Sequence, residues 1–237
     1  MSAAPTRLLI HGASGRMGRA LLRLAQADSR FQTVGAITRS GGTIDGVRTL
    51  AAERRSSALP FDVLVDFSLA EAFEGALELC LQRGAALVSG TTGLSAAQRA
   101  AMATAADAIP LLWSANFSLG VAVLHELVER AARALPGWDC HLLETHHVHK
   151  RDAPSGTALA LGETIAAARG EPPHYLSLRA GDVVGEHHVQ FTGVGERLEL
   201  IHRASDRDIF ARGALEAAAR IARRGPGSYS LGRLLLD

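Results

Sequence analysis

Chemically capable side chains crowd one short stretch of the sequence, ETHHVHKRDAPSGT, which runs from Glu144 to Thr157. Three of its histidines precede Lys150 and Arg151, and a Ser-Gly-Thr triplet closes it. Histidine ordinarily titrates near neutral pH and is also a frequent metal ligand. The stretch therefore suits three roles: a metal site, an acid–base site for an anionic substrate, or a polar loop.

The two cations favour the second role. Lys150 and Arg151 would stand beside a divalent metal ion with no run of carboxylates to offset their charge, so we expect no metal here. They would instead attract a carboxylate-bearing substrate, and a bound anion would favour a protonated histidine that acts as a general acid. Residues 155–157, at the expected start of a helix, offer N–H groups and a hydroxyl to another carboxylate oxygen.

A second chemical site is expected near the N-terminus, where HGASGRMG places Gly12, Gly15 and Gly18 between an apolar run and a helical pattern. Glycines at such a strand-to-helix turn let the backbone approach a pyrophosphate at the helix N-terminus. The next expected strand ends at Thr38 and Arg39, where many dinucleotide-binding domains carry a carboxylate for the ribose hydroxyls. Arginine can pair with a 2′-phosphate that a carboxylate would repel, so we expect NADPH to bind at least as well as NADH.

The elements that must position these residues follow from hydrophobic periodicity. In the first half, apolar strands alternate with helical patterns, which is typical of a buried parallel sheet with helices on both faces. The expected strands are 7–10, 31–38, 61–68, 85–90 and 109–114, and the expected helices are 16–26, 71–84 and 95–106. The strand-following loops GTTG and SANFS would lie at the carboxyl edge of that sheet, where ligands bind.

From residue 118 the pattern changes to antiparallel sheet plus helices, so we expect two domains with a boundary near residues 116–119. The expected elements there are a helix at 118–135, a strand at WDCHLLETH, a helix at 156–170, a hairpin turning at 193–195, and a helix at 208–225.

Composition excludes several classes of protein. The chain of 237 residues is 47% hydrophobic and 21% charged with a net charge of +1, so neither nucleic acid nor a membrane surface is an expected partner. Two distant cysteines without a CxxC motif argue against a disulfide framework. No stretch resembles a signal peptide or a membrane span, and we expect a cytoplasmic protein.

Five segments in order, HGASGRMG, GTTG, SANFSLGV, ETHHVHKRDAPSGTA and RAGDVVGEH, resemble the 4-hydroxy-tetrahydrodipicolinate reductase (dihydrodipicolinate reductase) family of lysine and diaminopimelate synthesis. The resemblance implies an α/β fold with a Rossmann-like dinucleotide-binding domain, residues 1–117 plus 208–237, whose sheet the C-terminal segment completes. It implies an inserted α+β substrate and oligomerisation domain at 118–207. It also implies NAD(P)H-dependent reduction of a small cyclic dicarboxylate, and a homotetramer assembled through the second sheet.

The same resemblance implies roles for single residues. His146 is the proton donor or acceptor, Lys150 is a second proton donor that also binds substrate, and His147, Gly156 and Thr157 hold the substrate carboxylate. The residues implied to hold the cofactor are Gly12, Ala13, Ser14, Gly15, Arg16, Met17, Arg39, Gly90, Thr91, Thr92, Ser114, Ala115, Asn116 and Phe117.

The chain departs from the family pattern in three places. Thr38 replaces a common acidic residue, and the segments 40–60 and 170–178 are shorter than usual. His149 receives no role from the resemblance, and we expect it to be structural. The alternatives to a reductase are a metal-assisted hydrolase built on the histidines and a dinucleotide sensor without catalysis.

Overall fold

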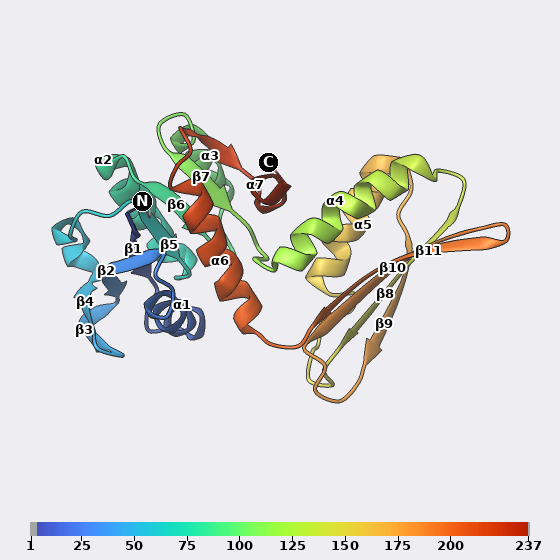
Figure 1. Ribbon diagram of the computed structural model, residues 1–237, viewed down its shortest axis with the longest axis horizontal. Coiled ribbons are helices and arrows are strands. Elements are labelled where there is room, and N and C mark those ends of the chain that lie inside the picture. Colours follow the sequence, from blue (N-terminus) through green and yellow to red (C-terminus); the bar gives the residue numbers. More distant parts are fainter. Residues whose placement is uncertain (1–3, 237) are drawn as a thin grey trace. The chain divides into compact units, whose positions relative to one another are not determined.

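A computed structural model describes residues 4–236 (Figure 1). Within these residues the chain forms two compact units: one comprises the chain up to Phe117 together with the segment from Phe210, and the other comprises Ser118–Ile209. The chain returns to the first unit at Phe210, whereas the sequence analysis places this boundary at residue 208.

The first unit contains an eight-stranded sheet in the order β12-β7-β6-β5-β1-β2-β4-β3. All neighbours in it are parallel except β3 and β4, which are antiparallel. Its strands are β1 (Thr6–His11), β2 (Phe31–Thr38), β3 (Ser40–Ile44), β4 (Val47–Ala51), β5 (Val63–Asp66), β6 (Ala86–Ser89), β7 (Pro110–Trp113) and β12 (Gly227–Tyr229). Since β12 pairs with β7, the C-terminal segment completes this sheet.

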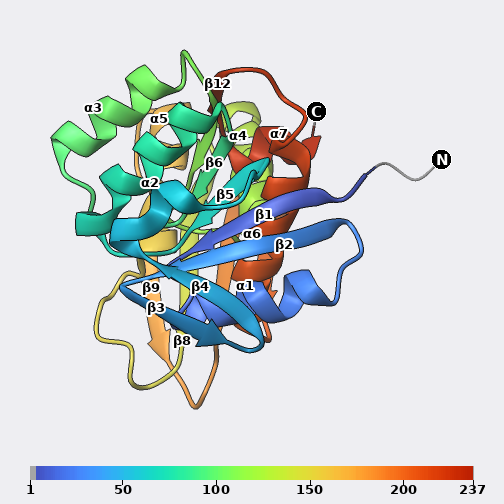
Figure 2. The ribbon, with the colours of Figure 1, turned by 90° about the vertical axis from the view of Figure 1, so that its left-hand side faces the viewer.

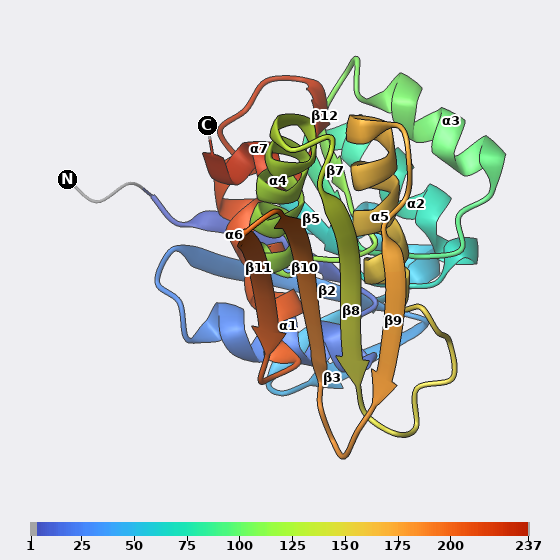
Figure 3. The ribbon, with the colours of Figure 1, turned by 90° about the vertical axis from the view of Figure 1, so that its right-hand side faces the viewer.

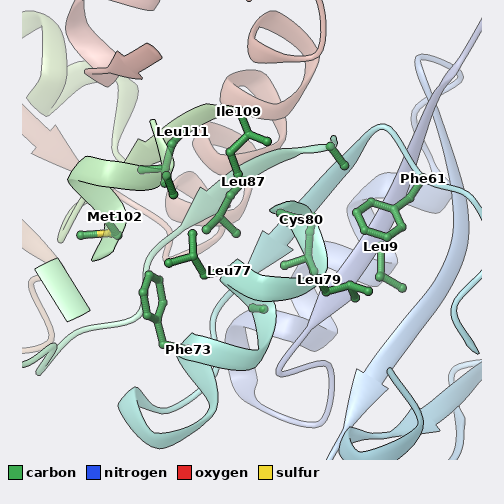
Figure 4. Packing of buried hydrophobic residues seen from close by; sticks show 14 of the residues in the cluster. Leu9, Phe61, Phe73, Leu77, Leu79, Cys80, Leu87, Met102, Ile109 and Leu111 are labelled. Carbon is green, nitrogen blue, oxygen red and sulfur yellow. The ribbon is translucent and has the colours of Figure 1, made fainter. Parts of the chain in front are cut away.

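Helices cover both faces of the first sheet, as the alternating pattern predicted: Figure 2 shows α2 and α3 on one face and α1 and α6 on the other. The helices are α1 (Arg16–Gln26), the 3-10 helix η1 (Ala52–Ser57), α2 (Ala70–Arg83), α3 (Ala96–Ala105), α6 (Asp208–Ile221) and α7 (Leu231–Leu236). One core cluster lies between this sheet and the helices α2 and α3. Figure 4 shows its larger members, among them Phe73, Leu77 and Leu87.

The sequence analysis missed β3 and β4. Their residues, rich in glycine and threonine, lack an apolar run, but Asp45 and Gly46 both have positive φ, 48° and 80°, and form the tight turn between them. An Asp-Gly pair is a recognised hairpin signal that would have located these strands. Several expected elements were too long: β5 covers only Val63–Asp66 of the expected 61–68, and α6 ends at Ile221 and not at residue 225.

The second unit contains a four-stranded sheet in the order β11-β10-β8-β9, with α4 and α5 on one face (Figure 3). Its elements are α4 (Leu119–Ala134), β8 (Asp139–His146), α5 (Gly156–Arg169), β9 (His174–Arg179), β10 (Gly185–Gly193) and β11 (Glu196–Ala204). The hairpin expected around Gly193–Gly195 is confirmed as β10 and β11. The expectation of a wholly antiparallel sheet was wrong, since the unpredicted edge strand β9 runs parallel to β8.

A separate core fills the space between this sheet and its two helices. Leu142, Val189 and Phe191 from the strands pack with Leu161 and Ile165 of α5, and all five are fully buried. Alternate strand residues point to one face of a sheet, so the residues of β8 that share the inward face continue from Leu142 to Glu144 and His146. The second core therefore ends in a polar layer that contains part of the predicted site.

Candidate active site

The glycine loop between β1 and α1 requires glycine for geometric reasons. Gly12 has a φ of +77°, and a Cβ there would lie 2.4 Å from the carbonyl oxygen of Phe67. A Cβ on Gly18 would lie 2.3 Å from the carbonyl oxygen of Gly12, because α1 packs closely on the loop. Gly15 occupies the N-cap of α1 without a side-chain cap. The first turn of this helix thus presents N–H groups suited to a pyrophosphate, and the residues present fit a dinucleotide.

The loop after β6 is held by a buried carboxylate. Asp66, at the end of β5, is fully buried, and its Oδ2 accepts hydrogen bonds from the hydroxyls of Ser89 and Thr91, both at 2.8 Å. Its Oδ1 accepts from the Ser68 backbone N–H at 3.1 Å and pairs with His11 Nδ1 at 2.9 Å. Burial alone would raise the pKa of Asp66, but these hydrogen bonds outweigh it and lower the pKa. Asp66 therefore joins the carboxyl ends of β1, β5 and β6.

The remaining predicted cofactor residues also follow the carboxyl ends of parallel strands. Arg39 directly follows β2 and is exposed, whereas Thr38 is buried and accepts a hydrogen bond from the Gly41 backbone N–H at 3.0 Å. The segments Gly90–Thr92 and Ser114–Phe117 follow β6 and β7. Because β2, β6 and β7 run parallel in one sheet, the loops that follow them lie at the same edge of that sheet.

In the second unit, His146 lies at the end of β8 in a charged, mostly buried environment. Its Nδ1 hydrogen-bonds to Oε2 of Glu144, which is itself buried, and Arg179 donates to both oxygens of that carboxylate, at 2.9 and 2.7 Å. Burial lowers the pKa of His146, with smaller contributions from Lys150 and Arg179, while Glu144 opposes the shift. Burial would raise the pKa of Glu144, but its hydrogen bonds lower it to about 2, so this carboxylate is ionised at neutral pH.

Lys150 and His147 lie in the turn that follows β8. The Lys150 backbone N–H donates to the His147 carbonyl at 3.1 Å, and the Lys150 ammonium pairs with Asp152 at 2.9 Å. His147 Nε2 lies 3.4 Å from a guanidinium nitrogen of Arg207, a cation that the sequence analysis did not select. His149 is exposed. The structure thus places Lys150, His147 and Arg207 together at the carboxyl end of β8, within one unit.

The predicted carboxylate-binding turn is the start of α5. Ser155 caps this helix, accepting the Ala158 backbone N–H at 3.2 Å, and Gly156 and Thr157 are its first residues. The Ser155 hydroxyl also lies 3.2 Å from His187 Nε2 of β10. The cap residue is therefore held from the sheet as well as from its own helix.

Two histidines of this unit were missed as parts of the site. His187 is buried, its ring lies 5.3 Å from that of His146, and burial lowers its pKa to about 4, with smaller contributions from His146 and His202. His202 Nε2 lies 3.2 Å from the hydroxyl of Ser118, the cap of α4. The signal available in the sequence was their inward position in the alternation of the hairpin.

Residues 4–236 offer neither a metal-binding cluster nor a helix that could span a membrane. No group of three or more His, Cys, Asp or Glu side chains there is arranged to hold a metal ion, and no helix there has the length and apolarity to cross a bilayer. His146, His187 and His147 instead pair with glutamate, serine and arginine side chains, respectively.

Comparisons with known proteins agree with this arrangement. Residues 6–117 match the family model described as dihydrodipicolinate reductase, N-terminus, and residues 120–235 match that described as dihydrodipicolinate reductase, C-terminus. A protein named 4-hydroxy-tetrahydrodipicolinate reductase from Xanthomonas campestris pv. campestris (strain B100) is 60% identical over 100% of both chains. One of the same name from Xylella fastidiosa (strain M23) is 55% identical over 97% of this chain and 98% of its own.

The solved structures confirm the expected α/β fold. A dipicolinate-bound dihydrodipicolinate reductase from Paenisporosarcina sp. TG-14 has a TM-score of 0.83 at 22% identity, covering 95% of this chain and 97% of its own. A C. glutamicum DAP dehydrogenase in complex with DAP has a TM-score of 0.64 at 17% identity, covering 98% of this chain and 96% of its own. Neither the hydrolase nor the sensor alternative gains support, and both halves of the chain match one family over nearly their whole length. The chain therefore belongs to the dihydrodipicolinate reductase family.

Proposed function

We propose that this chain reduces 4-hydroxy-tetrahydrodipicolinate to tetrahydrodipicolinate, the activity that names its relatives at 60% identity. The observation that carries the proposal is the arrangement after β8. His146, Lys150 and the start of α5 all lie in one unit, and His146 pairs with an ionised Glu144. An acid–base group, a cation and a helix N-terminus together suit a dicarboxylate that must accept a proton.

Each residue has a chemical task in this proposal. The ring loses its 4-hydroxyl group as water and gains a hydride. His146 donates the proton that the hydride addition requires, and Lys150 binds a carboxylate and serves as a second proton donor. His147 and the turn of Gly156 and Thr157 hold a carboxylate oxygen. A nicotinamide cofactor, when bound, supplies the hydride. The glycine loop, Arg39, Gly90–Thr92 and Ser114–Phe117 are the residues that would hold it.

The proposal is tested by following NADPH oxidation through the nicotinamide absorbance at about 340 nm, with substrate generated enzymatically in the same cuvette. His146→Gln should lower kcat by roughly 10²–10⁴-fold and leave KM nearly unchanged. Lys150→Ala should raise KM as well as lower kcat, because the ammonium binds and also donates. His149→Gln is the matched control, since His149 is an exposed histidine of the same turn. Near-full kcat in His146→Gln would overturn its role as the proton donor.

Arg39 supports use of NADPH, because it is exposed directly after β2 and no carboxylate stands in its place. Arg39→Ala should raise the KM for NADPH by about tenfold, because one charge-assisted hydrogen bond is lost. The KM for NADH should change much less. Arg48→Ala, an exposed arginine of β4, is the control. An equal effect on both cofactors would contradict a 2′-phosphate contact.

The second sheet supports a homotetramer as the working assembly. Its helices cover one face (Figure 3), while Leu176, Leu178 and Ile201 of β9 and β11 are 52%, 51% and 41% exposed. Apolar side chains exposed on a sheet suit contact with a second copy of the chain. Sedimentation equilibrium should give four chains, and Leu176→Lys with Ile201→Lys should reduce the mass. A monomeric parent protein would refute this assembly.

The cysteines support a place in the cytoplasm. Cys80 and Cys140 are both free and buried, as thiols commonly are in a reducing compartment. Fractionation of the source cells should recover the protein with the cytoplasmic enzymes.

A further inference from the structure

Glu144 is a buried carboxylate next to the proposed proton donor, His146. It lies two residues before His146 on β8, so both side chains leave the same face of the strand. Glu144 is only 1% exposed, yet it is charged, and burying a carboxylate is costly unless it is well paired. A buried ion pair is weak evidence of stabilisation, since apolar residues often serve as well. Its partners therefore point to a different role.

Those partners occupy both oxygens of the carboxylate. Oε2 accepts the hydrogen bond of His146 Nδ1 and one bond from Arg179 at 2.9 Å, and Oε1 accepts a second from Arg179 at 2.7 Å. Arg179 stands opposite His146 in the parallel register of β8 and β9. Such a bidentate pair restricts the orientation of both groups. The carboxylate can hence rotate little without losing one of these partners.

Arg179 also reaches the turn that carries Lys150. Its Nη2 donates to the backbone carbonyl of Asp152 at 2.6 Å, and the Asp152 carboxylate pairs with Lys150 at 2.9 Å. The Arg179 guanidinium thus connects the Glu144 carboxylate, which holds His146, to the turn that carries Lys150. Glu144 and Arg179 join the two without themselves being proposed to touch substrate.

The consequence for His146 follows from which ring nitrogen is occupied. With Nδ1 donating to Glu144, Nε2 is the nitrogen left for proton transfer. The charged or titratable groups around the ring are Glu144 on its own strand, Arg179 on β9, His187 on β10 and Lys150 in the following turn. Glu144 is the one anion among these four, so it opposes burial and the cations, which disfavour the imidazolium.

We propose that Glu144 and Arg179 are positioning residues for His146: Glu144 fixes Nδ1 and favours the protonated ring, and Arg179 fixes the carboxylate of Glu144. The proposal rests on the proposed function only in taking His146 as the proton donor. Replacing the carboxylate by an amide leaves one oxygen, which Arg179 can still occupy. The amide nitrogen would then face Nδ1 and favour a neutral ring with its proton on Nε2.

The first test is independent of turnover. The His146 ring is titrated by NMR in the parent protein, in Glu144→Gln and in Arg179→Lys, and assigned with His146→Gln. We expect the midpoint to fall clearly in Glu144→Gln and by less in Arg179→Lys, where the ammonium cannot hold both oxygens. Glu186→Gln is the matched control, a glutamate of the neighbouring strand β10 that pairs with Arg203 at 3.3 Å. An unchanged midpoint in Glu144→Gln would overturn the proposal.

The second test is the pH profile of kcat. A general acid loses activity as pH rises through its pKa, so Glu144→Gln should shift the alkaline limb to lower pH. kcat at pH 8 should fall about tenfold for each unit of that shift, while KM changes little. An equal loss of kcat at every pH would show that Glu144 has a merely structural role. Unfolding curves show whether Glu144→Gln is folded. If it is not, the pH profile of Arg179→Lys decides between the two roles. If the parent protein lacks reductase activity, the proposed function fails while the NMR titration still judges the positioning role.

Discussion

Asp66→Ala probes the polar cluster beneath the predicted cofactor loops. Asp66 is fully buried and accepts hydrogen bonds from four partners, namely the backbone of Ser68 and the side chains of His11, Ser89 and Thr91. Leaving one buried donor unsatisfied costs about 1–3 kcal/mol, which gives roughly 4–12 kcal/mol for four. The two hydroxyls can rotate to other acceptors and water can enter, so we expect a net loss of about 3–6 kcal/mol.

Asp66→Asn separates geometry from charge. Its amide oxygen can still accept from the Ser68 N–H and from His11, and its amide nitrogen can donate to a hydroxyl that turns to accept. We therefore expect a loss of about 1–2 kcal/mol, the difference between charged and neutral hydrogen bonds. Since Thr91 loses its anchor in Asp66→Ala, that variant should also raise the KM for NADPH more than Asp66→Asn does.

The assay is urea unfolding followed by tryptophan fluorescence. Trp113 Nε1 donates to the Thr91 carbonyl at 2.8 Å, so its emission reports on the same loop. A Trp138→Phe background removes the other tryptophan of the chain, which lies in the second unit. A loss below about 1 kcal/mol in Asp66→Ala, or equal losses in both variants, would refute the reasoning. The lowered pKa of Asp66 means that its stabilisation is present above about pH 4 and disappears as pH falls further, and Asp66→Ala should lack this dependence.

Three further predictions concern other parts of the chain. Gly18→Ala should weaken NADPH binding and stability together, because its Cβ would lie 2.3 Å from the Gly12 carbonyl oxygen; calorimetric titration that detects unchanged affinity would contradict this. Phe191→Ala should lower the unfolding free energy of the second unit by about 3–5 kcal/mol through the cavity it leaves, as measured by urea titration, with an exposed Leu198→Ala expected to cost far less. Glu144, with a pKa lowered to about 2, should contribute stability above about pH 4.3 that is lost as pH falls toward 2, a slope that Glu144→Gln should flatten in acid denaturation.

Local patterns in the sequence identified the elements with strong periodicity. The glycine loop, the apolar strands of the first sheet and the helix starting at Gly156 all depend on residues within about one turn or strand, so their signals are short-range. The edge strands β3 and β9, and β4 next to β3, carry few buried apolar residues, and periodicity did not reveal them. Their places depend on pairing with a neighbour rather than on their own pattern.

Sequence alone determined that His146 and Lys150 belong together, because they are four residues apart and share one motif with the start of α5. Only the tertiary structure decided what lies behind them. Arg179, 35 residues from Glu144, reaches its carboxylate through the parallel register of β8 and β9, and His187 reaches Ser155 across the sheet. The physical reason is that strand register depends on both paired segments and on the core that they cover. Tertiary packing, and not the residues adjacent in sequence, therefore determines the partners of a buried charge.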